Sequence, residues 1–303
     1  MKKAIGIDIG GTKIAAGIVS ESGELLVRSE VKSDPTDRER MFGKVVDAVE
    51  LIINRTPFSM EEISGIGVGV PGKVDREQGI AIFQNNLPWD QFPIKTRLRD
   101  QFQVDSITID NDVYMAAFAE WKTARVQVPE TFIYVTISTG ISCSIIHHGS
   151  FFRGAGFAGE LGLIPVLSKT AGMKNERLEI VSAGPAIENL ARGKLGAEHI
   201  TTKDVFQGYK NGALKYQSII EEVTDNLAQG LYSISCLLDP HKIVFGGSVI
   251  VNNPFLLELI KEKLRNYQLP EQQHVLESMC ISTLKQDNGI IGAGLSVFEN
   301  LNR

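Results

Sequence analysis

Asp8-Ile9-Gly10-Gly11-Thr12-Lys13 is the stretch that decides the fold, and it lies between two short apolar runs. Residues 4–9 and 14–19 have the apolar character of buried strands, which makes the stretch between them a tight turn. Paired glycines allow the close backbone approach that a bound phosphate needs, and the free N–H groups of such a turn attract anions. The stretch therefore predicts either a phosphate-binding loop or an ordinary β-hairpin.

The side chains of this turn favour a phosphate that is bound together with a metal ion. Gly10 and Gly11 would present backbone N–H groups, Thr12 a hydroxyl and Lys13 a positive charge. Asp8 would repel a bare phosphate. Its position is therefore explained if Mg²⁺ lies between the two and is bound to Asp8 through water.

Composition limits the class of protein. The chain has 303 residues, of which 43% are hydrophobic and 22% charged, and a formal net charge of −5. This length fits two domains of about 150 residues. The negative charge counts against a nucleic-acid partner, and no apolar run approaches the ~20 residues of a membrane span. We therefore expect a cytoplasmic globular protein with no nucleic-acid or membrane partner.

A further buried strand, over residues 63–70, ends at a Pro-Gly turn that contains Gly72. Open α/β sheets bind ligands at the carboxyl ends of their strands, so Gly72 is a candidate substrate contact. Asn86 lies in the polar loop that follows and could offer its amide to a ligand. The alternatives are a plain connection and a loop anchored by Trp89.

Asn111 and Asp112 lie where a strand over residues 106–109 meets a helix over residues 113–121. Asp and Asn are good helix N-caps, and this is the simpler interpretation. The functional one is that Asp112 accepts a proton from a substrate hydroxyl while Asn111 hydrogen-bonds to a neighbouring hydroxyl. A helix N-terminus makes a carboxylate a weak base, which phosphoryl transfer tolerates because its transition state is loose.

The strand–turn–strand pattern occurs again around Ser138-Thr139-Gly140, between strands predicted over residues 131–137 and 141–146. Two such turns, each at the start of one half of the chain, predict a duplicated fold that binds one polyphosphate from both sides. A further buried strand over residues 242–245 ends at a Gly-Gly turn that contains Gly247. The small residues of the last helix predict close packing against the helix over residues 113–121.

Together these motifs resemble the ROK group of sugar kinases and regulators, in the superfamily that includes actin, Hsp70 and hexokinase. In chain order, the motifs are residues 8–13, 67–75, 111–112, 138–140, 154–160, 178–187 and 246–248. The resemblance implies an α/β protein with two actin-like (ribonuclease H-like) lobes and a cleft between them. The lobes would span residues 1–113, completed by a C-terminal helix over 288–303, and residues 114–287.

The resemblance also assigns roles to individual residues, with ATP and Mg²⁺ as cofactors and a homodimer as the expected assembly. Asp112 would be the general base. Sugar hydroxyls would be bound by Asn111, Glu160 and Glu179. Phosphates would be bound by Thr12, Lys13, Thr139 and Gly140, and Gly247 would lie near the nucleoside.

The sequence departs from the family pattern in the region that usually binds zinc. Leu163 stands where family members have a histidine that binds both zinc and sugar, and residues 165–177 contain no cysteine. We therefore expect no structural zinc, and a 165–177 loop that is either held by packing or mobile. Leu163 would suit a substrate with an apolar or bulky substituent.

The predicted function is ATP-dependent phosphorylation of a sugar hydroxyl, with a hexose, an N-acylhexosamine or a β-glucoside as the acceptor. One alternative is a sugar sensor that has lost its chemistry and has no DNA-binding domain, since Asp8 comes too early for a preceding helix-turn-helix. The other is an ATPase of the actin or Hsp70 type that acts on proteins.

Overall fold

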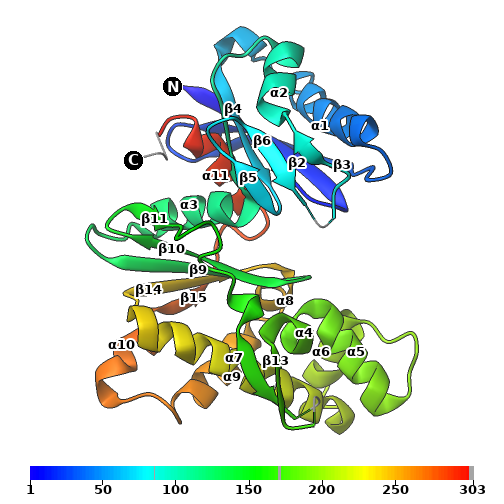
Figure 1. The fold of residues 1–303 in the computed structure, drawn as a ribbon, viewed down its shortest axis with the longest axis vertical. Helices are drawn as coiled ribbons and strands as arrows, with labels where there is room; N and C mark the ends of the chain where they lie inside the picture. Colours follow the sequence, from blue (N-terminus) through cyan, green and yellow to red (C-terminus); the bar gives the residue numbers. More distant parts are fainter. Residues whose placement is uncertain (85, 170–171, 300–303) are drawn as a thin grey trace. The chain divides into compact units, whose positions relative to one another are not determined.

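The chain forms two compact units in a computed structural model that describes residues 1–84, 86–169 and 172–299. Unit 1 comprises Met1–Arg125 together with Asp287–Arg303, and unit 2 comprises Val126–Gln286. Each unit is built on a five-stranded sheet covered by helices (Figure 1).

The unit 1 sheet has the strand order β3-β2-β1-β4-β8, in which the first two pairings are antiparallel and the last two parallel. The strands are β1 Lys3–Ile9, β2 Lys13–Ser20, β3 Leu25–Lys32, β4 Ile63–Val70 and β8 Ile107–Asn111. A smaller sheet contains β5 Lys73–Asp75, β6 Ile80–Phe83 and β7 Asp90–Phe92. The helices are α1 Arg38–Ile53, α2 Ile94–Phe102, α3 Asp112–Ala124, α11 Asn288–Ser296 and the 3₁₀ turn Met60–Glu62.

Alternation along β1 decides which way Asp8 points. Ile5 and Ile7 are fully buried in the core that includes α1, so Gly6 and Asp8 face the opposite side of the sheet. There α11 lies so close that a Cβ on Gly6 would be 1.9 Å from the Ile290 carbonyl oxygen. Only glycine permits this contact at position 6. Asp8 lies on the same face of β1 as Gly6, so its side chain points toward the first turn of α11.

Helices α3 and α11 pack tightly within unit 1, which confirms the predicted pairing of these helices. A Cβ on Gly292 would lie 1.7 Å from the Met115 carbonyl oxygen. This packing keeps all of α3 in unit 1, so the unit boundary falls after Arg125 instead of at the predicted residue 113. The C-terminal helix is also shorter than the predicted 288–303. It ends at Ser296, and residues 300–303 lie outside the described part of the chain.

The unit 2 sheet has the order β11-β10-β9-β14-β15, again with two antiparallel pairings followed by two parallel ones. The strands are β9 Thr131–Ile137, β10 Ile141–His147, β11 Ser150–Phe152, β14 Lys242–Gly246 and β15 Met279–Ile281. A hairpin pairs β12 Pro165–Ser168 with β13 Lys174–Arg177. The helices are α4 Leu178–Ser182, α5 Gly184–Leu195, α6 Thr202–Lys210, α7 Gln217–Leu238, α8 Ser248–Val251, α9 Phe255–Leu264 and α10 Gln273–Ser278. Three 3₁₀ turns complete the unit, at Leu161–Leu163, Leu214–Tyr216 and Pro270–Gln272.

The two sheets therefore share one topology, and each begins with a strand–turn–strand unit. This confirms the predicted duplicated α/β fold with ribonuclease H-like lobes. Within the described residues, no helix combines the length and the apolar character that crossing a membrane requires.

Candidate active site

The first predicted turn joins β1 to β2 and closes with a hydrogen bond from Gly10 N–H to the Lys13 carbonyl at 2.9 Å. Asn86 lies against this turn, since a Cβ on Gly11 would be 3.0 Å from both its side-chain nitrogen and its carbonyl oxygen. Two predicted elements of the site, the turn and the polar loop after β6, are therefore brought together. Asn85, the neighbour of Asn86, lies outside the described residues.

Asp8 is partly buried below this turn, beside the start of α11. A Cβ on Gly289 would lie 2.7 Å from an oxygen of its carboxylate. Burial, followed by repulsion from Asp112, raises the pKa of Asp8 to about 7, although Lys13 and Arg28 act to lower it. Asp8 and Asp112 are therefore neighbours in unit 1, and a cation bound beside Asp8 would relieve their repulsion.

A chain of ion pairs beside Asp8 was not predicted. Glu30 pairs with Lys13 Nζ at 2.9 Å and with Arg28 at 2.7 Å, and Arg28 also pairs with Asp287 at 2.8 Å. Arg28 lies in strand β3, where no sequence motif marks it. The Lys13–Glu30 pair is exposed and hence weak, so Lys13 can exchange Glu30 for a phosphate at little cost.

Asn111 and Asp112 begin helix α3 at the end of β8. The Asn111 side chain accepts a hydrogen bond from Val113 N–H at 2.9 Å, so the simpler interpretation of Asn111 as an N-cap is confirmed. Its amide group also donates to the Gly72 carbonyl at 3.0 Å, which joins two predicted site residues. Gly72 has a φ of +80°, and a Cβ there would lie 2.4 Å from the Phe83 carbonyl oxygen.

The second predicted turn, in unit 2, joins β9 to β10. Ser138 N–H donates to the Gly140 carbonyl at 2.9 Å, and Thr139 is exposed at the tip. The N–H of Gly184, at the start of α5, donates to the Ser138 carbonyl at 2.8 Å. Gly247 lies against the same strand end. Its φ is +87°, and a Cβ there would be 2.4 Å from the Ile137 carbonyl oxygen.

Glu160 and Glu179 form a second pair of neighbouring carboxylates, also in unit 2. Burial, followed by repulsion from Glu179, raises the pKa of Glu160. A Glu179 carboxylate oxygen is 3.4 Å from the Cβ position of Gly140 and 3.0 Å from that of Gly162. The pair therefore lies beside the Ser138–Gly140 turn. Cys143 lies behind it, where burial and then Glu160 raise the pKa of its thiol to about 12.

Comparison with known proteins shows the family of this chain. The sequence model of the ROK family matches residues 4–299. The chain belongs to the ROK family.

Among ROK relatives, a glucokinase of Halalkalibacterium halodurans is 28% identical over 98% of this chain and 96% of its own length. A β-glucoside kinase of Listeria monocytogenes is 26% identical over 99% of both proteins. The crystal structure of a ROK family glucokinase from Streptomyces griseus, in complex with glucose and AMPPNP, matches with a TM-score of 0.80 at 25% identity. That match covers 96% of this chain and 97% of the other.

In this ROK protein, residues 165–168 and 174–177 form the β12–β13 hairpin. We expected the 165–177 loop to be either held by packing or mobile, and the paired residues of the hairpin are held by packing. Thr170 and Ala171 lie outside the described residues. Leu163 is 41% exposed just before the hairpin. Among residues 1–84, 86–169 and 172–299, no three His, Cys, Asp or Glu side chains gather in a way that would hold a metal ion.

Proposed function

We propose that this ROK protein transfers the γ-phosphoryl group of ATP to a hydroxyl of a sugar. The observation that carries the proposal is the pairing of Asp8 with Asp112 in unit 1, beside a glycine turn. Burial, followed by repulsion from Asp112, raises the pKa of Asp8, and Lys13 and Arg28 offset this only in part. Magnesium with phosphate would supply further positive charge, and carboxylate oxygens are the donors that Mg²⁺ prefers.

In unit 1, Asp112 is proposed as the general base that accepts the proton of the attacking hydroxyl. Asp8 would hold Mg²⁺ through water, and the bound ion would neutralise charge on the transferred phosphoryl group. Asn111 and Gly72 are already joined by a hydrogen bond, so they would orient the sugar as one unit. The residues proposed to face phosphate here are Gly10, Gly11, Thr12 and Lys13, and Asn86 would contact the sugar.

In unit 2, Glu160 and Glu179 are proposed to accept hydrogen bonds from sugar hydroxyls. Burial and Glu179 both raise the pKa of Glu160, and such a carboxylate pair suits neutral polyols, whose O–H groups donate to both acids. Thr139 and Gly140 would bind phosphate, and Gly247 would leave room for the nucleoside.

We further propose that the acceptor carries an apolar or bulky substituent, as a β-glucoside or an N-acylhexosamine does. The support is Leu163, a partly exposed apolar side chain that lies three residues after Glu160 and beside Gly162, which itself contacts Glu179. We also propose a homodimer in the cytoplasm as the working form.

The test is ADP release from Mg-ATP with a panel of free hexoses, N-acetylhexosamines and β-linked disaccharides. We expect turnover that depends on one class of sugar, with β-glucosides or N-acetylhexosamines preferred over glucose. Sugar binding without turnover would overturn the kinase proposal in favour of a sensor. ATP hydrolysis that is indifferent to sugar would instead support an ATPase of the actin or Hsp70 type.

A further inference from the structure

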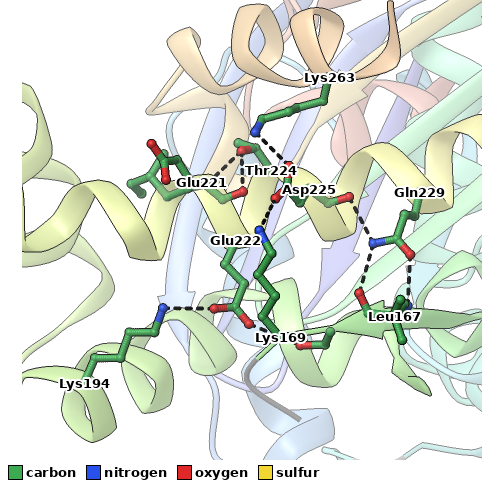
Figure 2. A network of polar contacts seen from close by, with 11 residues as sticks. Leu167, Lys169, Lys194, Glu221, Glu222, Thr224, Asp225, Gln229 and Lys263 are labelled. Atoms are coloured by element: carbon green, nitrogen blue, oxygen red, sulfur yellow. Dashed lines mark hydrogen bonds and ion pairs between the residues drawn. The ribbon is translucent and has the colours of Figure 1, made fainter. Parts of the chain in front are cut away.

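Helix α7 carries a row of polar side chains on the face that meets the β12–β13 hairpin (Figure 2). Glu222, Asp225 and Gln229 are three, four and seven residues apart, a spacing that places them on one side of a helix. Glu222 is only 3% exposed. A buried acid in the middle of a largely apolar helix needs partners, and they come from the hairpin and from α5.

The side chain of Gln229 binds the backbone of strand β12 at Leu167. Leu167 N–H donates to its side-chain oxygen at 2.9 Å, and its amide nitrogen donates to the Leu167 carbonyl at 3.1 Å (Figure 2). One side chain thus satisfies both backbone groups of a strand residue, as a neighbouring strand would. The two hydrogen bonds prevent β12 from sliding along α7 and from moving away from it.

Glu222 and Asp225 hold the end of the same strand. Glu222 accepts a hydrogen bond from Ser168 at 3.3 Å and from Lys194 of α5 at 3.0 Å. Asp225 pairs with Lys169 at 3.1 Å and with Lys263 of α9 at 2.8 Å. The Glu222 contacts are the more buried, so removing its charge would affect the hairpin more than losing the exposed Lys169 pair.

The hairpin leads directly to Glu179. Strand β13 ends at Arg177 and α4 begins at Leu178, with no linker between them. Leu178 N–H donates to the Ile164 carbonyl at 3.0 Å, across the base of the hairpin. Its side chain packs on α7, where a Cβ on Gly230 would lie 2.6 Å from it. A shift of the hairpin on α7 would therefore move the first turn of α4, which contains Glu179.

We propose that Glu222 and Gln229 are positioning residues that fix the hairpin on α7 and thereby hold Glu179 at the sugar. The inference rests on the proposed function, because it takes Glu179 to be a sugar ligand. Positioning of this kind has large kinetic effects, since a displacement of about 1 Å can cost about 100-fold in rate. Residues 165–177 contain no cysteine. The hairpin is held by the burial of Val166 in the core that includes α7 and by the polar contacts of Glu222 and Gln229.

The test compares two pairs of matched variants on α7. Gln229→Leu removes both contacts with Leu167. Glu222→Gln removes the charge that pairs with Lys194 and leaves Ser168 a weaker, neutral acceptor. The controls are Glu221→Gln and Gln217→Leu, since these two residues are exposed and the side chain of Gln217 donates a hydrogen bond to that of Glu221. Because Leu167 is 45% exposed, water can replace Gln229, so Gln229→Leu should fold even if Glu222→Gln does not.

The readouts are amide hydrogen exchange over residues 165–168 and 172–183 and the separate KM values for sugar and for ATP. We expect Glu222→Gln and Gln229→Leu to speed exchange about tenfold there. They should raise the sugar KM about tenfold while the ATP KM stays within about twofold of the wild type. The controls should match the wild type in both.

Three results would overturn the inference. The first is exchange in α4 that is no faster than in the controls. The second is faster exchange with an unchanged sugar KM. The third is an equal rise of both KM values, which would indicate a general loss of structure. If the wild type phosphorylates no sugar, the proposed function fails, and exchange in α4 alone then decides whether α7 holds this helix in place.

Discussion

The two strand–turn–strand motifs occupy equivalent positions in the sheets of units 1 and 2, yet their electrostatic surroundings differ. In unit 1 the Gly10–Lys13 turn lies beside Asp8 and Asp112, and the cations Lys13 and Arg28 partly offset the acids. In unit 2 the Ser138–Gly140 turn lies beside Glu160 and Glu179, and both influences on the pKa of Glu160, burial and Glu179, raise it. Duplication thus preserved the backbone turn while the side chains around it diverged.

This difference indicates a division of labour between the two carboxylate pairs. Acids that are mixed with cations suit the handling of phosphate, metal and protons, whose charges change during reaction. Acids without cations suit neutral hydroxyl donors. Changes in the Asp8–Asp112 pair should therefore affect turnover, and changes in the Glu160–Glu179 pair should affect sugar affinity.

Asp112→Asn should have the largest effect of all. It removes the proposed base but keeps the shape of the side chain, so we expect kcat to fall about 10³-fold with the sugar KM changed less than about threefold. Steady-state kinetics with saturating Mg-ATP measures both. Asp110, which is buried on the preceding strand β8, is not assigned to the chemistry. Wild-type turnover in Asp112→Asn would refute the division of labour.

Glu179→Gln should show the opposite pattern. A hydrogen bond to a charged acceptor contributes about 1.5–3 kcal/mol, so losing the charge should raise the sugar KM about 10- to 100-fold, with kcat affected much less. The same variant removes the repulsion that helps to raise the pKa of Glu160. That pKa should therefore move down toward its usual range, which carbon-13 NMR of the Glu160 carboxyl can follow. A fall in kcat with an unchanged sugar KM would reverse the assigned roles.

Much of this comparison was predictable from sequence, because the motifs are local. Glycine pairs at strand ends and the Asn111–Asp112 junction are read from neighbouring residues, and the repeated strand–turn–strand pattern predicted the duplicated sheet. The carboxylate pairs join residues far apart in the chain, and only the resemblance to ROK proteins placed Glu160 and Glu179 near one ligand.

What the sequence did not reveal depends on tertiary contacts. Arg28 reaches the site through strand pairing, and nothing in its own neighbourhood marks it. The unit boundary differed because α3 is held by glycine contacts with α11, 170 residues or more further along the chain. The polar row of α7 did carry a signal in its helical spacing, but its partners in the hairpin depend on the fold.

Asp8→Asn should change stability with a definite dependence on pH. The pKa of Asp8 is raised from 3.8 to about 7 in the folded state, so the folded protein binds this proton more tightly than the unfolded chain. The stability that this proton binding supplies is present below pH 4 and is lost as pH rises through about 7. Ionised Asp8 then destabilises the fold by about 2 kcal/mol, allowing for its partial exposure.

We therefore expect the thermal midpoint of the wild type to fall more than that of Asp8→Asn between pH 5 and pH 8. At pH 8 the variant should be the more stable of the two. Mg-ATP should reverse this order, because the ion binds the ionised carboxylate and stabilises only the wild type through it. Equal midpoints at pH 8 without ligand would show that Lys13 and Arg28 fully offset the burial of Asp8 and its repulsion from Asp112, and the argument that this pair needs a bound cation would fail.

The smallest effect should come from the exposed pair of Lys13 and Glu30. Exposed ion pairs contribute about 0–1 kcal/mol, so Lys13 is held only weakly by its partner. Glu30→Gln should free Lys13 for phosphate and lower the ATP KM about twofold, while Lys13→Met should raise it a few-fold. Neither variant should alter the sugar KM, since neither changes the Glu160–Glu179 pair. A lower ATP KM in Glu30→Gln together with a higher ATP KM in Lys13→Met would show that Lys13 acts on the nucleotide. A change in the sugar KM would instead assign Lys13 to the sugar.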